Sequence, residues 1–293
     1  YDGPVPPGRL KLAEWLKKSG TPGISDIDTR RLTLHLRDYG SRNGIILKAF
    51  DGESLKEDEL AAALDYLKAF PDMEGRNCIS EVGITEGEEL LSDGELTLAV
   101  VDCGIKGKII REMKRLGLRI VLFPSDASAQ RILSCKPQGV FYSNGPGDPA
   151  TLGSLVENIQ SLLGVIPVFG ICLGHQLIAA ALGAKTRKMG LGHHGCNNPV
   201  RDELSGKVSV TSQNHGFDVD EATLPADTRV WFRNANDGTV EGIINEEKRV
   251  LTSQFHPEAA PGPHDSLWIF RRFYDEMIDF ARSEHKEGAH GHS

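Results

Sequence analysis

The segment 167–176 reads Pro-Val-Phe-Gly-Ile-Cys-Leu-Gly-His-Gln and carries a cysteine with a glycine two residues to either side. An apolar run typical of a strand leads into Cys172, and a helical pattern follows it. Gly170-x-Cys172-x-Gly174 is the thiol counterpart of the Gly-x-Ser-x-Gly turn that exposes a nucleophile between a strand and a helix. At a helix N-terminus, the dipole and free N–H groups stabilise a thiolate. A buried structural cysteine is the commoner alternative.

A cysteine nucleophile needs a base, and the segment 254–258, Gln-Phe-His-Pro-Glu, offers one after an apolar run. Residues two apart in an extended chain face the same side, and Pro257 favours extended geometry for the residue before it. We therefore expect His256 and Glu258 to project together, with the carboxylate orienting the imidazole. An exposed turn is the alternative for this segment alone. Combined with Cys172, the pattern favours a catalytic group of all three.

Backbone N–H groups near the thiol could bind an oxyanion, and we expect that of Leu173 to point there. The loop 143–149, Ser-Asn-Gly-Pro-Gly-Asp-Pro, follows an apolar strand, and its glycines and prolines fix an unusual turn. The N–H groups of Gly145 and Gly147 could complete the oxyanion hole or hold a substrate. A plain tight turn is the alternative. Gln176 lies one helical turn after the cysteine, so it can face the same pocket.

Apolar runs alternate with segments of helical length in the region that positions these residues. The runs cover 96–101, 119–123, 139–142 and 165–169, and the helical segments cover 106–116, 127–133 and 151–163. This alternation predicts an α/β fold with a mostly parallel open sheet flanked by helices. Ligands of such sheets bind at the carboxyl ends of the strands. The strand-rich region 207–254 should extend the sheet, and 265–285 should form a closing helix.

We predict three regions along the chain. Residues 1–92 form a partial, smaller N-terminal α/β domain with helices near 9–18, 25–39 and 59–70, and 96–284 form the main domain. The acidic segment 85–95 has the composition of a linker. The tail 286–293 is expected to be disordered, and its histidines would bind metal weakly at most.

Composition narrows the class of protein. A formal net charge of −8 argues against a general nucleic-acid binder. Five irregularly spaced cysteines argue against a disulfide framework or a structural zinc site, so reduced thiols and no metal are expected. No apolar run has the length of a membrane span and no signal peptide is visible, which favours a cytoplasmic protein without a membrane partner.

Together these motifs resemble the class I glutamine amidotransferases, and residues 97–284 resemble the small, glutaminase subunit of carbamoyl-phosphate synthetase. The narrower resemblance rests on Gly192-His-His-Gly195, Asn197-Asn-Pro199, Ser212-Gln-Asn-His-Gly-Phe217, the segment 256–265, and the segment 24–32, which is similar to that subunit's N-terminal domain. By this resemblance the N-terminal part is truncated and lacks a serine-bearing loop that contacts glutamine. Cys103, Cys196 and Asn198 depart from the family's usual residues.

The resemblance implies that Cys172 attacks the side-chain carbonyl of L-glutamine, that His256 relays protons and that Glu258 orients His256. It places glutamine contacts on Gly145, Gly147, Leu173, Gln176, Asn214, Gly216 and Phe217. It also implies a partner, the large synthetase subunit, which uses ammonia from this chain to make carbamoyl phosphate for arginine and pyrimidine biosynthesis. ATP, Mg and bicarbonate then bind to that partner, and no cofactor is expected on this chain.

Three alternatives remain. The chain could be a glutaminase that serves a different synthetase, although the His-His-Gly and Asn-His-Gly-Phe segments argue against this. It could be a catalytically weak structural or regulatory subunit, although the nucleophile, base and carboxylate are all present. A cysteine hydrolase or protease would leave the glutamine-pocket residues unexplained. Because uncoupled hydrolysis wastes glutamine, we expect low activity from the isolated chain.

Overall fold

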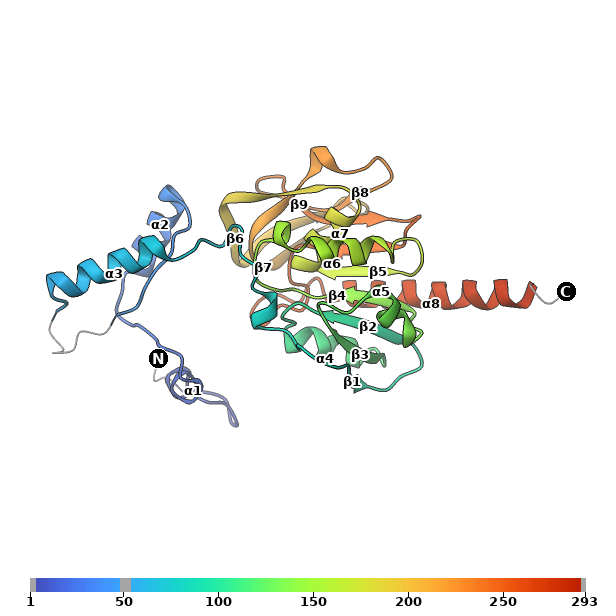
Figure 1. The fold of residues 1–293 in the computed structure, drawn as a ribbon, viewed down its shortest axis with the longest axis horizontal. Coiled ribbons are helices and arrows are strands. Elements are labelled where there is room, and N and C mark those ends of the chain that lie inside the picture. The colour runs from blue at the N-terminus through green and yellow to red at the C-terminus, as the bar shows by residue number, and fades with distance from the viewer. Residues whose placement is uncertain (1–3, 48–53, 291–293) are drawn as a thin grey trace. The chain divides into compact units, whose positions relative to one another are not determined.

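The computed structural model describes residues 4–47 and 54–290 of the chain (Figure 1). Its contacts divide the chain into two compact units, Tyr1–Asp72 and Met73–Ser293. The sequence predicted this boundary later, between residues 92 and 96. The stretch 73–92 belongs to the second unit because its strand, residues 89–92, joins the main sheet.

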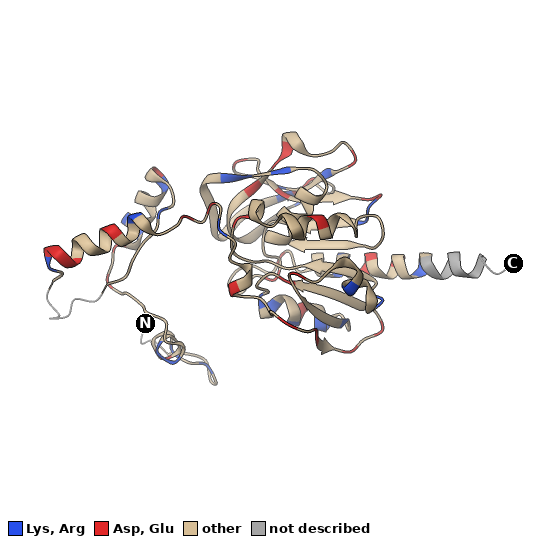
Figure 2. Ribbon diagram, in the orientation of Figure 1, with Lys and Arg blue, Asp and Glu red and all other residues tan. Residues whose placement is uncertain are grey.

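The first unit contains α1 (Leu12–Ser19), α2 (Thr29–Tyr39) and α3 (Glu57–Ala69), close to the three helices expected from the sequence. Helix α2 begins where the Asp28 side chain accepts a hydrogen bond from the N–H of Arg31. Acidic side chains occupy the first turn of α3, where the helix dipole favours them (Figure 2). Residues 4–47 and 54–72 of this unit contain no strand.

The second unit is built on a ten-stranded sheet with the order β1-β3-β2-β4-β5-β10-β9-β8-β6-β7. The strands are β1 (Glu89–Ser92), β2 (Thr97–Asp102), β3 (Arg119–Pro124), β4 (Gly139–Tyr142), β5 (Val168–Ile171), β6 (Lys185–Asp202), β7 (Val208–Asp220), β8 (Arg229–Asn234), β9 (Val240–Asn245) and β10 (Val250–Ser253). The five strands β3, β2, β4, β5 and β10 are parallel, and antiparallel strands extend both sides. The predicted α/β fold is confirmed.

Helices cover both faces of the parallel part of this sheet (Figure 1). They are α4 (Gly107–Arg115), α5 (Ala129–Ser134), α6 (Gly153–Gln160), α7 (Leu173–Ala181) and α8 (Trp268–His290), with short 3-10 turns η1 (Ile79–Glu81), η2 (Pro149–Thr151) and η3 (Glu221–Thr223). Apolar side chains of α6 and α7 pack on one face, and those of α4 and α8 pack on the other. The central strands are buried on both sides, which explains their continuous apolar runs.

Three elements differ from what the sequence indicated. The acidic segment 85–95 is not only a linker, because it contains β1, a partly exposed edge strand paired antiparallel with β3. No sequence pattern had indicated β6, whose 18 residues are mostly polar or glycine. Helix α8 continues to residue 290 and takes in part of the tail expected to be disordered, while 291–293 lie outside the described residues.

The helices of residues 4–47 and 54–290 include none with the length and apolar character needed to cross a membrane.

Candidate active site

Cys172 lies between the end of β5 and the start of α7, at the carboxyl end of a parallel strand. Its backbone has φ 56° and ψ −106°, a conformation that a residue with a side chain adopts only under strain. The N–H of Cys172 donates to the carbonyl of Ser253 at 2.8 Å, which holds the turn against β10. The thiol lies 4.0 Å from the carbonyl oxygen of Asn214, and Cys172 as a whole is 6% exposed.

The two glycines around Cys172 are required by close backbone contacts. A Cβ atom at Gly174 would lie 2.1 Å from the carbonyl oxygen of Tyr142, and one at Gly170 would lie 2.6 Å from the carbonyl carbon of Gly174. Any side chain would therefore push α7 away from β4 and β5. The spacing recognised in the sequence thus reflects how tightly the strand-to-helix turn packs.

His256 and Glu258 lie beside this turn, as the sequence predicted. Nδ1 of His256 and Oε1 of Glu258 are 2.8 Å apart, and both side chains are buried. The reason for the contact differs from our expectation of an extended segment. The N–H of Ala259 donates to the carbonyl of His256 at 3.0 Å, which closes a turn, while the N–H of His256 donates to the carbonyl of Ser212 on β7 at 2.9 Å.

The electrostatics of this group favour a protonated imidazole. Burial alone would lower the pKa of His256, but Cys172 and Glu258 outweigh it and raise that pKa to about 10. Burial alone would likewise raise the pKa of Glu258, but His256 and Lys106 hold it below its usual value. The carboxylate is therefore ionised and the imidazole positively charged near neutral pH.

Lys106 belongs to this group and was missed by the sequence analysis. Its Nζ lies 2.9 Å from Oε1 of Glu258 and 2.9 Å from the carbonyl oxygen of Ala259. The lysine precedes α4, in the loop after β2, so parallel strands bring it to the same edge of the sheet. Its position after the first parallel strand was the one available signal, and it does not identify a carboxylate partner.

The glycine-proline loop lies at the same edge. Gly147 forms an antiparallel bridge with Asn77, and the N–H of Gly75 donates to Oδ2 of Asp148 at 2.8 Å. Gly145 packs against the loop after β2, since a Cβ there would lie 2.1 Å from the carbonyl oxygen of Cys103. The segment 73–78 therefore forms one wall beside this loop, which the sequence did not predict.

The remaining expected glutamine contacts differ in exposure. Nε2 of Gln176 donates to the carbonyl of Phe217 at 3.0 Å and to Oε1 of Gln254 at 2.9 Å, and both Gln176 and Phe217 are buried. Gln176 thus ties α7 to β7, while Asn214 is exposed and Gly216 half-buried. Their contact with glutamine stays a prediction.

A cavity of about 300 Å³ lies elsewhere in this unit, among residues that include Val200, Lys207, Phe255 and Trp268. Neither Cys172 nor its two partners line that cavity. The candidate active site is therefore assigned from the grouping of nucleophile, imidazole and carboxylate at the strand ends, and not from the position of this cavity.

The chain is similar to known proteins over most of its length. Residues 99–276 match the class-I glutamine amidotransferase family, and residues 8–46 match the CPSase domain of the carbamoyl-phosphate synthase small chain. The chain is 41% identical over 284 residues to the carbamoyl phosphate synthase small chain of Akkermansia muciniphila, covering 94% of this chain and 74% of that one. It is 45% identical over 288 residues to that of Pseudomonas aeruginosa, covering 92% and 75%.

A solved structure supports the fold. The crystal structure of a Thermoplasma acidophilum protein, described as one of the subunits of GMP synthase, superposes with a TM-score of 0.53 at 23% identity, covering 66% of this chain and 98% of that one. The sequence relatives are far more similar and span nearly the whole chain. The chain therefore belongs to the carbamoyl-phosphate synthase small chain family and carries a class I glutamine amidotransferase domain.

Proposed function

We propose that this chain hydrolyses L-glutamine to glutamate and ammonia through a thioester on Cys172, and so supplies ammonia for carbamoyl phosphate synthesis. The observation that carries the proposal is the grouping at the carboxyl end of β5. A strained cysteine at a helix N-terminus lies against His256, whose Nδ1 is 2.8 Å from the buried carboxylate of Glu258. Family membership supplies the substrate class.

In the first half-reaction the sulfur of Cys172 attacks the side-chain amide carbon of glutamine. The C–N bond breaks and the protonated His256 gives its proton to the leaving nitrogen, so that ammonia departs and a γ-glutamyl thioester remains. The N–H of Leu173 belongs to the first turn of α7, which leaves it free of an intrahelical partner and able to stabilise the oxyanion with Gly145 or Gly147.

In the second half-reaction a water molecule attacks the thioester carbon. The neutral His256 accepts a proton from that water, the C–S bond breaks, and glutamate leaves. Glu258 stabilises the imidazolium in both steps, and Lys106 holds Glu258 in place. These groups supply the proton transfers, so the proposed reaction needs no cofactor on this chain.

The proposal includes a partner, the large synthetase subunit. It would receive the ammonia and would bind the ATP, Mg and bicarbonate needed to make carbamoyl phosphate for arginine and pyrimidine biosynthesis. The relatives are named as small chains, which supports a larger partner. The match of residues 8–46 to the CPSase domain favours this partner over a different synthetase.

The test is release of glutamate and ammonia from glutamine, with and without a large synthetase subunit from a related enzyme. Cys172→Ala should lower the rate by roughly four orders of magnitude or more, since nucleophile and base act as a unit. Cys135→Ala is the matched control, because Cys135 ends α5 and its thiol contacts the carbonyl of Ile132. Activity that survives Cys172→Ala would refute the mechanism, and a rate that the partner does not raise would refute the coupling.

A further inference from the structure

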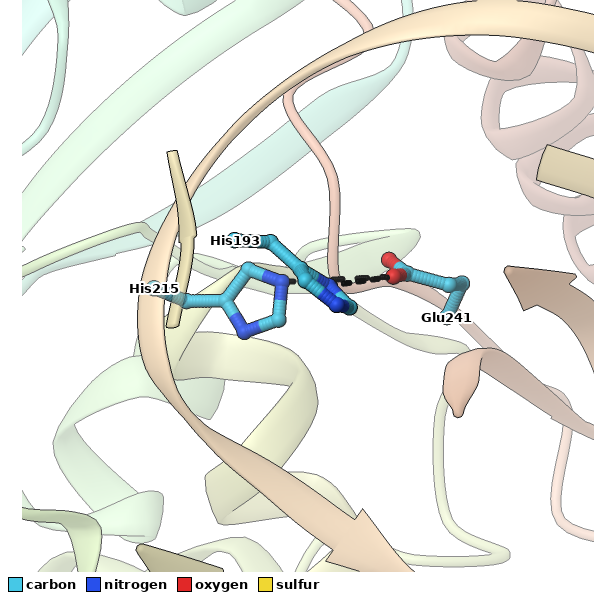
Figure 3. A group of neighbouring side chains, drawn as sticks. All are labelled: His193, His215 and Glu241. Atoms are coloured by element: carbon cyan, nitrogen blue, oxygen red, sulfur yellow. Dashed lines mark hydrogen bonds and ion pairs between the residues drawn. The ribbon is translucent and has the colours of Figure 1, made fainter. Parts of the chain in front are cut away.

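A second cluster of polar side chains lies on the antiparallel part of the sheet. His193 on β6, His215 on β7 and Glu241 on β9 bring one ligand atom each to within 4.8 Å of one another. Figure 3 shows one ring nitrogen of each imidazole facing the carboxylate of Glu241. His193 and His215 are cross-strand partners in the β6–β7 pairing, so their closeness follows from the register.

The outer nitrogen of each ring is already occupied. Nε2 of His193 lies 2.8 Å from Oδ2 of Asp237, and Nδ1 of His215 lies 2.9 Å from the carbonyl oxygen of Phe217. Each acceptor therefore favours an N–H on the outer nitrogen. Burial alone would lower the pKa of His193, but Glu241 and Asp237 raise that pKa to about 9, so a metal ion at its inner nitrogen would take the place of a proton. A carboxylate or carbonyl behind a histidine is the arrangement that orients metal-binding imidazoles.

The atoms that face the centre are therefore mostly acceptors. Oε1 of Gln213 lies 2.6 Å from Nε2 of His215 and 3.2 Å from Nδ1 of His193. The amide of Gln213 is oriented this way because its Nε2 donates to Oγ1 of Thr211 at 3.3 Å. Neutral imidazoles and a carbonyl oxygen repel at such distances unless a proton or a metal ion lies between them.

Glu241 adds a negative charge that needs compensation. Its side chain is 0% exposed; Oε1 accepts from Nδ2 of Asn234 at 3.2 Å, and Oε2 has no hydrogen-bond partner among the described residues. Within the described ranges its ion-pair partners are the two imidazoles, with no lysine or arginine among them. A buried carboxylate without a permanent cation is costly, and a bound metal ion would remove that cost.

We propose that Nδ1 of His193, Nε2 of His215 and the carboxylate of Glu241 bind one divalent transition-metal ion of the zinc class, with Oε1 of Gln213 as the fourth ligand. In a tetrahedral site with bonds of about 2.1 Å, neighbouring ligand atoms lie about 3.4 Å apart. The measured separations bracket this value. Nδ1 of His193 is 3.1 Å from Oε1 of Glu241, and Nε2 of His215 is 4.0 Å from that same oxygen.

This site is separate from the glutamine chemistry and would be structural, since four protein ligands fill the coordination sphere. It would clamp β6, β7 and β9 together beside the exposed Asn214. Cysteine spacing could not indicate it, because no cysteine takes part and the ligands come from three separate strands. The set of nitrogen and oxygen ligands suits Zn²⁺ better than Ca²⁺ or Mg²⁺, which prefer oxygen alone.

The experiment measures metal binding to the full chain with its tail histidines, His285, His290 and His292, replaced by asparagine. After chelator treatment, the protein competes with a chromophoric chelator for Zn²⁺, and Co²⁺ is then added as a spectroscopic probe. We expect about one ion per chain, with a cobalt spectrum that shows tetrahedral ligation without a thiolate charge-transfer band. The same binding should persist in Cys172→Ser.

Two variants decide the assignment. Glu241→Gln should weaken zinc binding at least ~100-fold, and Asp237→Asn, which removes the carboxylate charge behind His193, should weaken it ~10- to 100-fold. Asp237 has a side chain that is 45% exposed, so its variant should fold even if the Glu241 variant does not. His194→Asn is the matched control, because this neighbouring histidine bonds to Asn214 outside the cluster and should not change the affinity.

The proposal is overturned if the tail-substituted chain binds no zinc, or if Asp237→Asn and His194→Asn bind it equally well. It is also overturned if binding disappears in Cys172→Ser or if cobalt shows a thiolate band, since the ion would then sit at the nucleophile. Circular dichroism of the metal-free variants separates loss of a ligand from loss of the fold.

Discussion

Replacing Glu258 by glutamine isolates the effect of its charge on His256. The substitution keeps the volume of the side chain and an oxygen that can accept from Nδ1 of His256, but removes the negative charge 2.8 Å from that nitrogen. The pKa of His256 should fall, because less of the favourable interaction with the imidazolium remains.

The structure sets the size of this fall. Two unit charges 2.8 Å apart interact with about 6 kcal/mol at an effective dielectric constant of about 20. This is an upper limit, because the amide oxygen still accepts a hydrogen bond. The pKa of His256 is raised from 6.5 to about 10, and Cys172 contributes alongside Glu258. Assigning roughly half of that net rise to Glu258 puts the pKa of the variant near ~8.

The consequence is a change in how stability depends on pH. His256 has a higher pKa in the folded chain than in the unfolded chain, so its contribution is complete below about pH 6.5 and lost as pH rises through about 10. In Glu258→Gln the loss should end near ~pH 8. Between about pH 8 and 9.5 the wild-type chain should therefore lose ~2 kcal/mol more than the variant, at about 1.4 kcal/mol per pH unit.

Urea unfolding at about pH 6.5, 8 and 9.5 measures this difference directly. Other groups that titrate in this range are common to both proteins and cancel in the comparison. Glu276→Gln is the control, because that carboxylate pairs with Arg249 and Arg272 away from His256, and it should keep the wild-type pH slope. A wild-type-minus-variant difference that stays constant from pH 8 to 9.5 would refute the reasoning.

Two further substitutions probe the same site. Gly174→Ala should lower the free energy of unfolding by ~2–4 kcal/mol and abolish glutaminase activity, because its Cβ would meet the carbonyl oxygen of Tyr142; Gly153→Ala, with open space around its Cβ, is the control in both assays. Lys106→Met should raise the pKa of Glu258, so that on acidification activity is lost at a higher pH; a pH–rate profile with an unmoved acid limb would contradict the role of the lysine.

Candidate catalytic residues could be predicted from the sequence where the local backbone geometry allows only certain residue types. The glycines on either side of Cys172, Gly170 and Gly174, form a recognisable pattern because the backbone contacts at both positions leave no room for a side chain. The pairing of His256 with Glu258 was predicted, although a turn rather than an extended segment produces it. Lys106 could not be found in this way, since its contact with Glu258 depends on which strands lie side by side in the sheet.

The missed strands share a physical cause. β1 lies at the edge of the sheet, and its exposed positions tolerate the acidic residues that suggested a linker. β6 pairs with β7 through two register shifts, and much of it faces solvent, so it shows neither an apolar run nor a clean alternation. The apolar central strands were recognisable because helices cover both of their faces.

In strand β7 the buried positions alternate as in an ordinary strand, but several of them are polar, so the alternation does not appear as a hydrophobic pattern in the sequence. Burial alternates from 211 to 217, but the buried members at 211, 213 and 215 are Thr, Gln and His. Their polar side chains contact one another in a row that runs from Thr211 through Gln213 to His215, whose Nδ1 lies against the carbonyl of Phe217. The same carbonyl accepts from Gln176 on α7 at 3.0 Å. These contacts therefore connect the cluster around Glu241 to the helix that begins at the nucleophile.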